Sequence, residues 1–482
     1  MKILIAASEA VPFVMTGGLA EVTGSLLKEY RKVSGTEVVL MLPLYPGLRE
    51  RFELAETGIR LSVPVGTRRH EGRVWAFGSS VYFFECREFF ERSELYGTSR
   101  GDYSDNAARF TFFSRAILDA CMAMGFRPDV IHCNDWQTGL VPLYLKSLYK
   151  SGFFERTATV FTIHNLGYQG LFSASDLYLT GLGGEWFTPE GIEFYGKVNF
   201  LKAGLIGADS ITTVSPTYAK EILTPEFGYG LEGVLKKRSD RLYGILNGID
   251  TEEWNPRTDP NIAATYEPAD IGGKDLCRKR LLEECLLSDD ERLPVAAVVG
   301  RLSAQKGLDI LVDSIEEIIS KGARLIMLGK GDELFQRRVL EVAERHKGSV
   351  FVRIGYDVSF AHRIYAGSDI FIMPSRYEPC GLGQMIAMTY GTVPVARKTG
   401  GLVDTIVDYE PLREYGTGFL FEDYRAAALR ECMKRALCFY AERKRWNPLV
   451  SNAMMKDFSW ETSAARYLKL YAETTEAAMR RG

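Results

Sequence analysis

Short apolar runs alternate along the chain with stretches in which apolar residues recur every three or four positions. Near the start, strand-like runs at Ile3–Ala7 and Glu37–Leu42 flank a segment that is predicted to be helical. One face of that helix would be buried, and it carries Leu19, Val22, Leu26, Tyr30 and Val33. Later in the first half, buried strands are predicted at Val130–His132, Ala158–Ile163 and Ser210–Val214.

The second half repeats the alternation with shorter connections. The predicted strands are Val295–Val299, Arg324–Leu328, Val350–Ile354, Asp369–Met373 and Thr392–Ala396. The predicted helices between them are Gly307–Ser320, Glu333–His346, Phe360–Ala366 and Leu382–Tyr390. Strands that alternate with helices in this way predict a parallel sheet covered by helices on both faces.

The chain has 482 residues, more than the roughly 250–300 at which a single hydrophobic core stops growing. We therefore predict an α/β protein with two doubly wound, Rossmann-like domains that face each other across a cleft. The predicted domains are residues 1–245 and 246–458. An irregular stretch at Trp446–Phe458 precedes a final helix at Trp460–Arg481, and residues 459–482 are expected to cross back to the first domain.

Composition and charge narrow the classes of function. The net charge of −3 gives no electrostatic reason to expect nucleic acid or a membrane as partner. No apolar run approaches the roughly 20 residues that span a bilayer, and the N-terminal run stops before Glu9, which favours a strand over a signal peptide. Eight cysteines without a C-x-x-C pair and five unpaired histidines predict reduced thiols and no metal site. We expect a cytoplasmic protein, or one in the plastid stroma if a transit peptide has been removed.

Polar residues directly after predicted strands are candidates for function, because ligands of open α/β sheets bind beyond the carboxyl ends of strands. Arg301 and Lys306 follow Val295–Val299 and bracket a helix start. Two cations there suit a diphosphate, and solvated surface charges are the alternative. Glu378 follows Asp369–Met373, where a carboxylate can bind sugar hydroxyls or balance an oxocarbenium-like charge.

The segment after Glu378 leads into a predicted helix. The backbone amides of Cys380, Gly381 and Leu382 would lie at its start and could bind an anion. No histidine or asparagine partner is signalled for a nucleophilic Cys380, so we interpret this cysteine as a packing residue.

Two features of the first half have the same placement. The segment Thr16-Gly-Gly-Leu-Ala20 opens the first helix, and its glycines let the backbone approach an anion, with a plain turn as the alternative. Asp135, His164 and Asn165 stand where predicted strands end. They are candidates for contacts with sugar hydroxyls, and a structural role for the histidine is the alternative.

Together these motifs resemble one enzyme family. Thr16-Gly-Gly-Leu, His132-x-x-Asp-Trp, Thr162-Ile-His-Asn, Asn247-Gly-Ile-Asp, Arg301 with Lys306, and Ser375-Arg-Tyr-Glu-Pro-Cys-Gly-Leu look like the bacterial and plant glycogen and starch synthases. These are retaining glycosyltransferases of family five with the GT-B fold. The resemblance implies transfer of glucose from ADP-glucose to the non-reducing end of an α-1,4-glucan, with no cofactor and no metal.

The resemblance also implies roles for individual residues. Arg301 and Lys306 would hold the diphosphate, and Glu378 would hold the glucose together with the amides of Cys380 to Leu382. His164 and Asp135 would line the sugar site. The remaining substrate-binding positions would be Met15, Gly17, Gly18, Glu21, Tyr96, Asn165, Asn247 and Tyr356, the last of which would stack on the nucleobase.

The chain departs from the family pattern at a few positions. Met15 stands where lysine is usual and removes a cation from the donor site, Glu21 replaces aspartate, and Gln137 replaces a frequent histidine. Many related transferases carry a second glutamate at the position of Ile386, and the synthase branch generally lacks it. Two alternatives follow: the same fold using UDP-glucose, and a degenerate homologue that binds glucan without turning it over. A nicotinamide dehydrogenase is disfavoured because the G-x-G-x-x-G turn is missing.

Overall fold

The computed structural model describes residues 1–98, 101–150 and 152–480, which form two compact units. Unit 1 contains Met1–Val214, Ala219–Ile245 and the C-terminal segment from Trp460. Unit 2 contains Ser215–Tyr218 and Leu246–Ser459. Within the described ranges, no helix combines the length and the hydrophobicity that crossing a membrane requires.

Unit 1 is built on one large sheet. Among the described residues its strand order is β14-β13-β9-β8-β1-β2-β5-β4-β3. The strands are β1 (Lys2–Ala6), β2 (Glu37–Pro43), β3 (Ala55–Val65), β4 (Arg68–Phe77), β5 (Val81–Glu85), β8 (Val130–Asn134), β9 (Ala158–Ile163), β13 (Ser210–Thr213) and β14 (Leu242–Gly244). Pairing is parallel from β14 to β5, so the carboxyl ends of β1, β8 and β9 meet at one edge.

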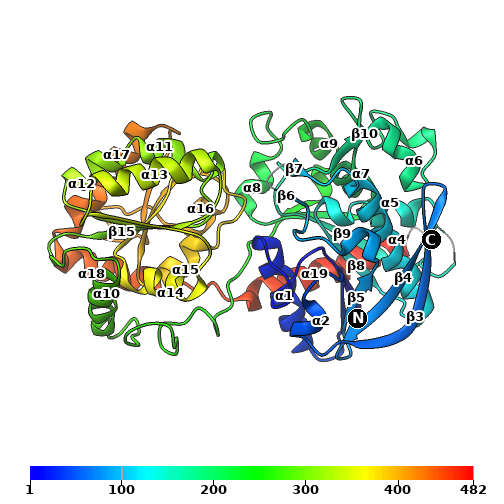
Figure 1. Ribbon diagram of the computed structural model, residues 1–482, viewed down its shortest axis with the longest axis horizontal. Helices are drawn as coiled ribbons and strands as arrows, with labels where there is room; N and C mark the ends of the chain where they lie inside the picture. Colours follow the sequence, from blue (N-terminus) through cyan, green and yellow to red (C-terminus); the bar gives the residue numbers. More distant parts are fainter. Residues whose placement is uncertain (99–100, 151, 481–482) are drawn as a thin grey trace. The chain divides into compact units, whose positions relative to one another are not determined.

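The edge of this sheet formed by β5, β4 and β3 is antiparallel, whereas a parallel sheet was predicted. Strands β3 and β4 form an antiparallel hairpin, and β4 pairs antiparallel with β5 (Figure 1). Buried and exposed positions alternate along the second part of β3, as expected for a sheet with one face toward solvent. The described residues of unit 1 also form two small sheets. One pairs β6 (Gly97–Thr98) with β7 (Gly101–Asp102), and the other contains β10 (Leu171–Ser173), β12 (Lys197–Asn199) and β11 (Glu193–Phe194).

Helices cover the sheet of unit 1. They are α1 (Gly18–Arg31), α2 (Leu48–Arg51), α3 (Arg87–Phe90), α4 (Asn106–Met124), α5 (Leu140–Lys146), α6 (Leu177–Thr180), α7 (Phe200–Gly207), α9 (Glu232–Lys237) and α19 (Trp460–Met479), and the short α8 (Pro216–Glu221) follows β13. Helix α19 packs against α1 and β9. Its Tyr471 shares hydrogen bonds with Tyr30 (3.1 Å) and with Nδ1 of the buried His132 (2.7 Å). The predicted end of this helix, Arg481, lies outside the described residues.

Unit 2 contains a parallel sheet whose strand order, over the described residues, is β17-β16-β15-β18-β19-β20. The strands are β15 (Val295–Val299), β16 (Arg324–Gly329), β17 (Val350–Ile354), β18 (Ile370–Met373), β19 (Val393–Arg397) and β20 (Phe419–Phe421). The chain runs outward from β15 to β17 and then returns to β18 on the other side of β15. The gap between β15 and β18 is therefore the topological switch point, where open α/β sheets bind their ligands.

Helices lie on both faces of the unit 2 sheet, with α11 and α13 on one side and α14 and α15 on the other (Figure 1). The helices are α10 (Gly272–Glu284), α11 (Leu308–Val312), α12 (Ile315–Ser320), α13 (Glu333–Arg345), α14 (Val358–Gly367), α15 (Gly383–Thr389), α16 (Gly400–Thr405), α17 (Ala426–Tyr440) and α18 (Arg443–Met454). The predicted helix Gly307–Ser320 is divided, because α11 ends at Val312 and α12 begins at Ile315.

The prediction of an irregular stretch at Trp446–Phe458 was wrong for its first part, which belongs to α18. Pro448 lies inside this helix and removes one hydrogen-bond donor. Trp446, Leu449, Val450 and Ala453 are all buried on one face. Packing of that face outweighs the poor helix propensity of proline.

Candidate active site

The loops on either side of the unit 2 switch point are joined by an ion pair. Lys306 follows β15 and Glu378 follows β18, and the Lys306 Nζ lies 2.6 Å from Glu378 Oε2. The Ser375 hydroxyl donates to the same oxygen at 3.0 Å. Gly307, at φ +75°, permits this approach, because a Cβ there would lie 2.0 Å from the carbonyl oxygen of Pro374. The pair lies where the topology predicts a ligand site.

The Glu378 carboxylate of this ion pair is buried. Glu378 is 4% exposed, and a buried carboxylate is costly unless a cation and hydrogen bonds compensate it. Lys306 and Ser375 provide that compensation. Sequence reasoning expected Lys306 at the diphosphate and Glu378 at the glucose, and the structure brings the two groups into direct contact.

The residues after Glu378 form a tight turn that leads into α15. A backbone hydrogen bond joins Asn247 to the Cys380 thiol, and burial raises the pKa of that thiol to about 12. Such a thiol stays protonated at neutral pH, which argues against a nucleophilic role. Gly381 and Leu382 directly precede α15. The side-chain oxygen of Asn247 is buried without a hydrogen-bond partner in the structure.

Arg301 and Tyr356 lie on neighbouring loops at the same edge of the sheet. The amide of Gly300 donates to the carbonyl of Leu328 after β15, and the amide of Gly355 donates to that of Gly329 after β17. Arg301 is exposed, and Tyr356 is 74% exposed. Both side chains are therefore presented at the carboxyl edge of β15 to β17, beside the Lys306 loop.

In unit 1 a hydrogen-bonded cluster surrounds Glu9, at the carboxyl end of β1. The Thr16 hydroxyl donates to the Glu9 carboxylate at 2.8 Å, and the Thr16 amide also donates to it. The Tyr96 hydroxyl donates to Glu9 Oε1 at 2.5 Å and lies 2.7 Å from the Ser8 hydroxyl. Burial and the neighbouring Glu9 carboxylate raise the pKa of Tyr96 well above its usual value, so its proton is retained. Tyr96 thus positions Glu9.

Asp135 and His164 stand at the ends of the adjacent strands β8 and β9. Asp135 adopts a positive φ of 53°, a conformation that is uncommon for residues other than glycine. Its Oδ1 accepts the His164 amide at 2.8 Å, and the Asn165 amide also donates to its carboxyl group. Burial raises the pKa of Asp135 to about 7, and the nearby Glu9 adds to the effect. Asp135 therefore changes charge near neutral pH.

The ring of His164 is held as a neutral imidazole. Burial lowers its pKa to about 3. His164 Nε2 lies 2.9 Å from Asn134 Oδ1, and the Asn134 amide nitrogen donates to the carbonyls of Ala6 and His132. Because these two carbonyls fix the amide orientation, Asn134 Oδ1 accepts and Nε2 carries the proton. The other ring nitrogen, Nδ1, is then the acceptor.

The loop before α1 carries the remaining candidates of unit 1. Gly17 and Gly18 open α1, and Glu21 lies in its first turn. Met15 is 52% exposed. It lines a cavity of about 530 Å³ together with Val14, Thr16, Tyr45, Pro46, Glu91, Arg92, Ser93, Glu94 and Leu95.

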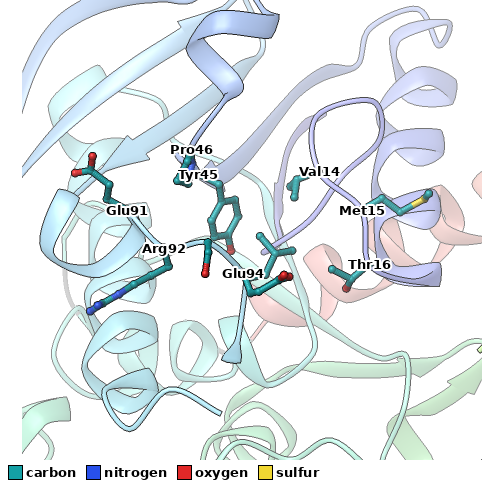
Figure 2. A pocket seen from close by; sticks show the side chains of 10 residues that line it. Val14, Met15, Thr16, Tyr45, Pro46, Glu91, Arg92 and Glu94 are labelled. Atoms are coloured by element: carbon teal, nitrogen blue, oxygen red, sulfur yellow. The ribbon is translucent and has the colours of Figure 1, made fainter. Parts of the chain in front are cut away.

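The basic residue of this cavity does not replace the lysine that is usual at position 15, as the direction of its side chain in Figure 2 indicates. Arg92 points away from Met15. Its guanidinium donates to the Asp105 carboxylate at 2.7 Å and to the carbonyl of Glu88 at 2.9 Å. Arg92 is the one cation among the ten described residues that line the cavity, so Met15 leaves this loop without a positive charge.

Comparisons with known proteins agree with this geometry. Residues 2–237 match the family model described as starch synthase catalytic domain, and residues 287–448 match that of glycosyl transferases group 1. A glycogen synthase from Thermodesulfovibrio yellowstonii is 46% identical, over 98% of this chain and 97% of its own length. The chain belongs to the glycogen and starch synthase family. The resemblance seen in its motifs is confirmed.

Further members of the glycogen and starch synthase family show the same likeness. A glycogen synthase from Syntrophotalea carbinolica is 46% identical, over 99% of both chains. Among solved structures, the catalytic domain of starch synthase IV from Arabidopsis thaliana bound to ADP and acarbose superposes with a TM-score of 0.91. It is 34% identical and covers 98% of this chain and 99% of its own. The predicted fold class, two Rossmann-like domains of the GT-B type, is confirmed.

Two residues of this family member's candidate site were missed from the sequence. Glu9 is a buried acid three residues after the end of β1, a placement that could have singled it out. Asn134 was missed because the predicted strand ended at His132, whereas β8 continues to Asn134. A polar residue at the last position of a buried strand is the signal that would have found it.

Proposed function

We propose that this protein transfers glucose from ADP-glucose to the non-reducing end of an α-1,4-glucan, with retention of configuration. The observation that carries the proposal is the Lys306–Glu378 pair at the switch point of unit 2, in a chain of the glycogen and starch synthase family. A cation beside a buried carboxylate offers groups of opposite charge to a diphosphate and to a sugar that becomes positive as its bond breaks.

For the donor, Arg301 and Lys306 hold the diphosphate and stabilise the charge that develops on it during bond cleavage. The Gly18 amide, at the N-terminus of α1, can donate a hydrogen bond to an anionic group of the donor. ADP is what a glucose transfer from ADP-glucose leaves behind, and the related starch synthase IV structure contains ADP. Tyr356 stacks on the nucleobase, which suits its high exposure.

For the glucose, the Glu378 carboxylate accepts hydrogen bonds from hydroxyls and balances the oxocarbenium-like charge. The amides of Cys380 to Leu382 donate hydrogen bonds to the sugar hydroxyls. The leaving phosphate takes the proton of the acceptor hydroxyl on the same face of the sugar, which preserves the configuration without a carboxylate nucleophile. Ile386, at the position of the second glutamate in related transferases, agrees with this route. Asp135 and His164 Nδ1 accept hydrogen bonds from sugar hydroxyls.

The other proposed contacts are those that the family resemblance supplies. Asn247, whose buried side-chain oxygen lacks a partner, and Asn165 contribute polar contacts to the substrate. Tyr96 acts near the sugar through Glu9. Met15, Gly17 and Glu21 belong to the donor loop. All eight cysteines are free thiols, which supports a reducing compartment such as the cytoplasm.

The experiment that tests the proposal measures radiolabelled glucose incorporation into glycogen from ADP-glucose and UDP-glucose in parallel. We expect a higher kcat/KM with ADP-glucose. A higher kcat/KM with UDP-glucose would show that UDP-glucose is the donor, and the assignment as a glucosyltransferase would stand. No incorporation from either nucleotide sugar, together with intact glycogen binding, would support the degenerate homologue instead.

A further inference from the structure

Two tyrosines of unit 1 adopt a backbone conformation that is unfavourable for their residue type. Tyr195 has φ 49° and the following Gly196 has φ 77°. The two residues form the turn between β11 and β12, where Phe194 pairs with Lys197 across the hairpin. A two-residue hairpin turn with both φ values positive is usually Asn-Gly, because asparagine and glycine tolerate this conformation.

The same combination occurs a second time. Tyr229 has φ 49° and Gly230 has φ 83°. The amide of Leu231 closes this turn on the carbonyl of Gly228 at 2.8 Å. Backbone strain in a bulky residue that recurs in two turns indicates that the rings, rather than the turns, require tyrosine.

The two turns meet on one surface, which we call the aromatic patch and define as Phe194, Tyr195 and Tyr229. The rings of Phe194 and Tyr195 lie edge to face, with centroids 4.8 Å apart. A Cβ on Gly230 would lie 2.8 Å from the Phe194 ring and 3.3 Å from the Tyr195 ring, so both rings rest on this turn. Tyr195 is 83% exposed and Tyr229 is 40% exposed.

A buried side chain connects the aromatic patch to the loop that carries His164. Gln169 is 7% exposed, and its Nε2 donates to the carbonyl of Tyr229 at 3.1 Å. Its Oε1 accepts from Asn199, at the end of β12, at 2.7 Å. Gln169 lies five residues after His164, a separation of at most about 18 Å along the chain. Gln169 thus ties the turn that carries Tyr229 to the segment that follows His164.

We propose that the aromatic patch binds the α-glucan acceptor several sugars away from its reacting end. The proposal rests on the proposed function. Pyranose rings present apolar C–H faces that pack on exposed aromatic rings, and the neighbouring Glu193 and Lys197 suit sugar hydroxyls. A stable protein partner would need about 800 Å² on each side, far more than three rings supply. An α-glucan is a chain of many sugars, so the sugars beyond its reacting end can contact a second surface of unit 1.

The test uses Tyr195→Asn in the full chain, because asparagine suits the turn and removes the ring. Affinity electrophoresis in gels containing glycogen measures the dissociation constant without any donor. We expect Tyr195→Asn to weaken glycogen binding about tenfold. Tyr195→Trp keeps an aromatic ring at this position and should retain the affinity of the wild type. Tyr178→Asn is the matched control, since Tyr178 is a tyrosine of unit 1 that is 58% exposed outside the patch. Its affinity should equal that of the wild type.

Thermal unfolding and kinetics complete the test. The unfolding midpoint of Tyr195→Asn should equal or exceed that of the wild type, and the ratio of KM for glycogen to KM for maltotriose should rise. An unchanged glycogen affinity would overturn the proposal, as would a loss of affinity that accompanies a lower midpoint. A change in oligomeric mass with unchanged affinity would make the patch an interface between copies. If the wild type transfers no glucose while its glycogen binding depends on Tyr195, the proposed function fails and the patch stands.

Discussion

In unit 1 the candidate residues are buried acids around a neutral histidine, whereas in unit 2 they are loop cations beside one buried carboxylate. Glu9 and Asp135 hold their positions through hydrogen bonds to backbone amides and a tyrosine. In unit 2, the charge of Glu378 is compensated by Lys306, and Arg301 is exposed. The first set suits neutral sugar hydroxyls, and the second suits a phosphate group.

The two units differ in how the charged and polar side chains at their strand ends are held. At the edge of β1, β8 and β9, polar side chains form hydrogen bonds with the backbone and with one another, and these bonds hold their geometry. At the switch between β15 and β18, a flexible lysine reaches the carboxylate from another loop. Met15 increases the difference, because the usual lysine there would have given the loop before α1 a cation.

The largest effect is expected from Glu378→Gln, which removes a buried negative charge at the switch point of unit 2. Removal of a preorganised electrostatic group costs about 10²–10³ in rate, so kcat should fall at least 100-fold while the fold is kept. The measurement is the initial rate of glucose incorporation at saturating ADP-glucose. Glu422→Gln is the matched control, since Glu422 pairs with Lys398 at 3.0 Å on the surface. Wild-type activity in Glu378→Gln would contradict the assignment.

Asp135→Asn tests the acidic character of the unit 1 site through pH. Burial raises the pKa of Asp135 to about 7, so the carboxylate forms only as the pH rises through neutrality. If the ionised form binds the sugar, kcat/KM of the wild type should rise between pH 6 and 8. In Asp135→Asn we expect a fall of about 100-fold and no rise over this range. An unchanged pH profile in the variant would assign the titration to another group.

The same substitution has a consequence for stability. A carboxyl group whose folded pKa is raised stabilises the fold at low pH, and that contribution is lost as the pH rises through the folded value. The unfolding midpoint of Asp135→Asn should therefore increase relative to the wild type between pH 5 and pH 8. Thermal unfolding at these two pH values measures the difference, and a constant difference would contradict the raised pKa.

The smallest expected effect belongs to Met15→Lys, which would reduce the contrast between the units. A charge-assisted hydrogen bond contributes about 1.5–3 kcal/mol, and 1.4 kcal/mol is tenfold in affinity. Because Met15 is half exposed, we expect the KM for ADP-glucose to fall about tenfold. Met455→Lys, at a methionine that is 66% exposed in unit 2, adds the same charge elsewhere and should leave KM unchanged. A rise in KM for Met15→Lys would show that the loop is built differently.

Much of the fold could be predicted from local patterns, because each of β15 to β18 is a short apolar run followed by a helical period, whereas the three-residue strand β20 was missed. The β3–β4 hairpin and α18 could not, since alternation in a long exposed strand is weak and Pro448 argues against a helix. The candidate residues were recognisable by their position after strands. Their contacts were not, because Lys306 and Glu378 are 72 residues apart and Tyr96 and Glu9 are 87 apart. The order of the strands in the sheet brings these residues together, and local sequence patterns do not predict that order.

The most direct test of the central claim couples donor cleavage to chain growth. With ADP-glucose labelled in the glucose and a glycogen acceptor, the account predicts one ADP released for each labelled glucose bound to glycogen. It also predicts that both signals fall together in Glu378→Gln. ADP release without labelled glycogen, or neither signal in the wild type, would contradict it.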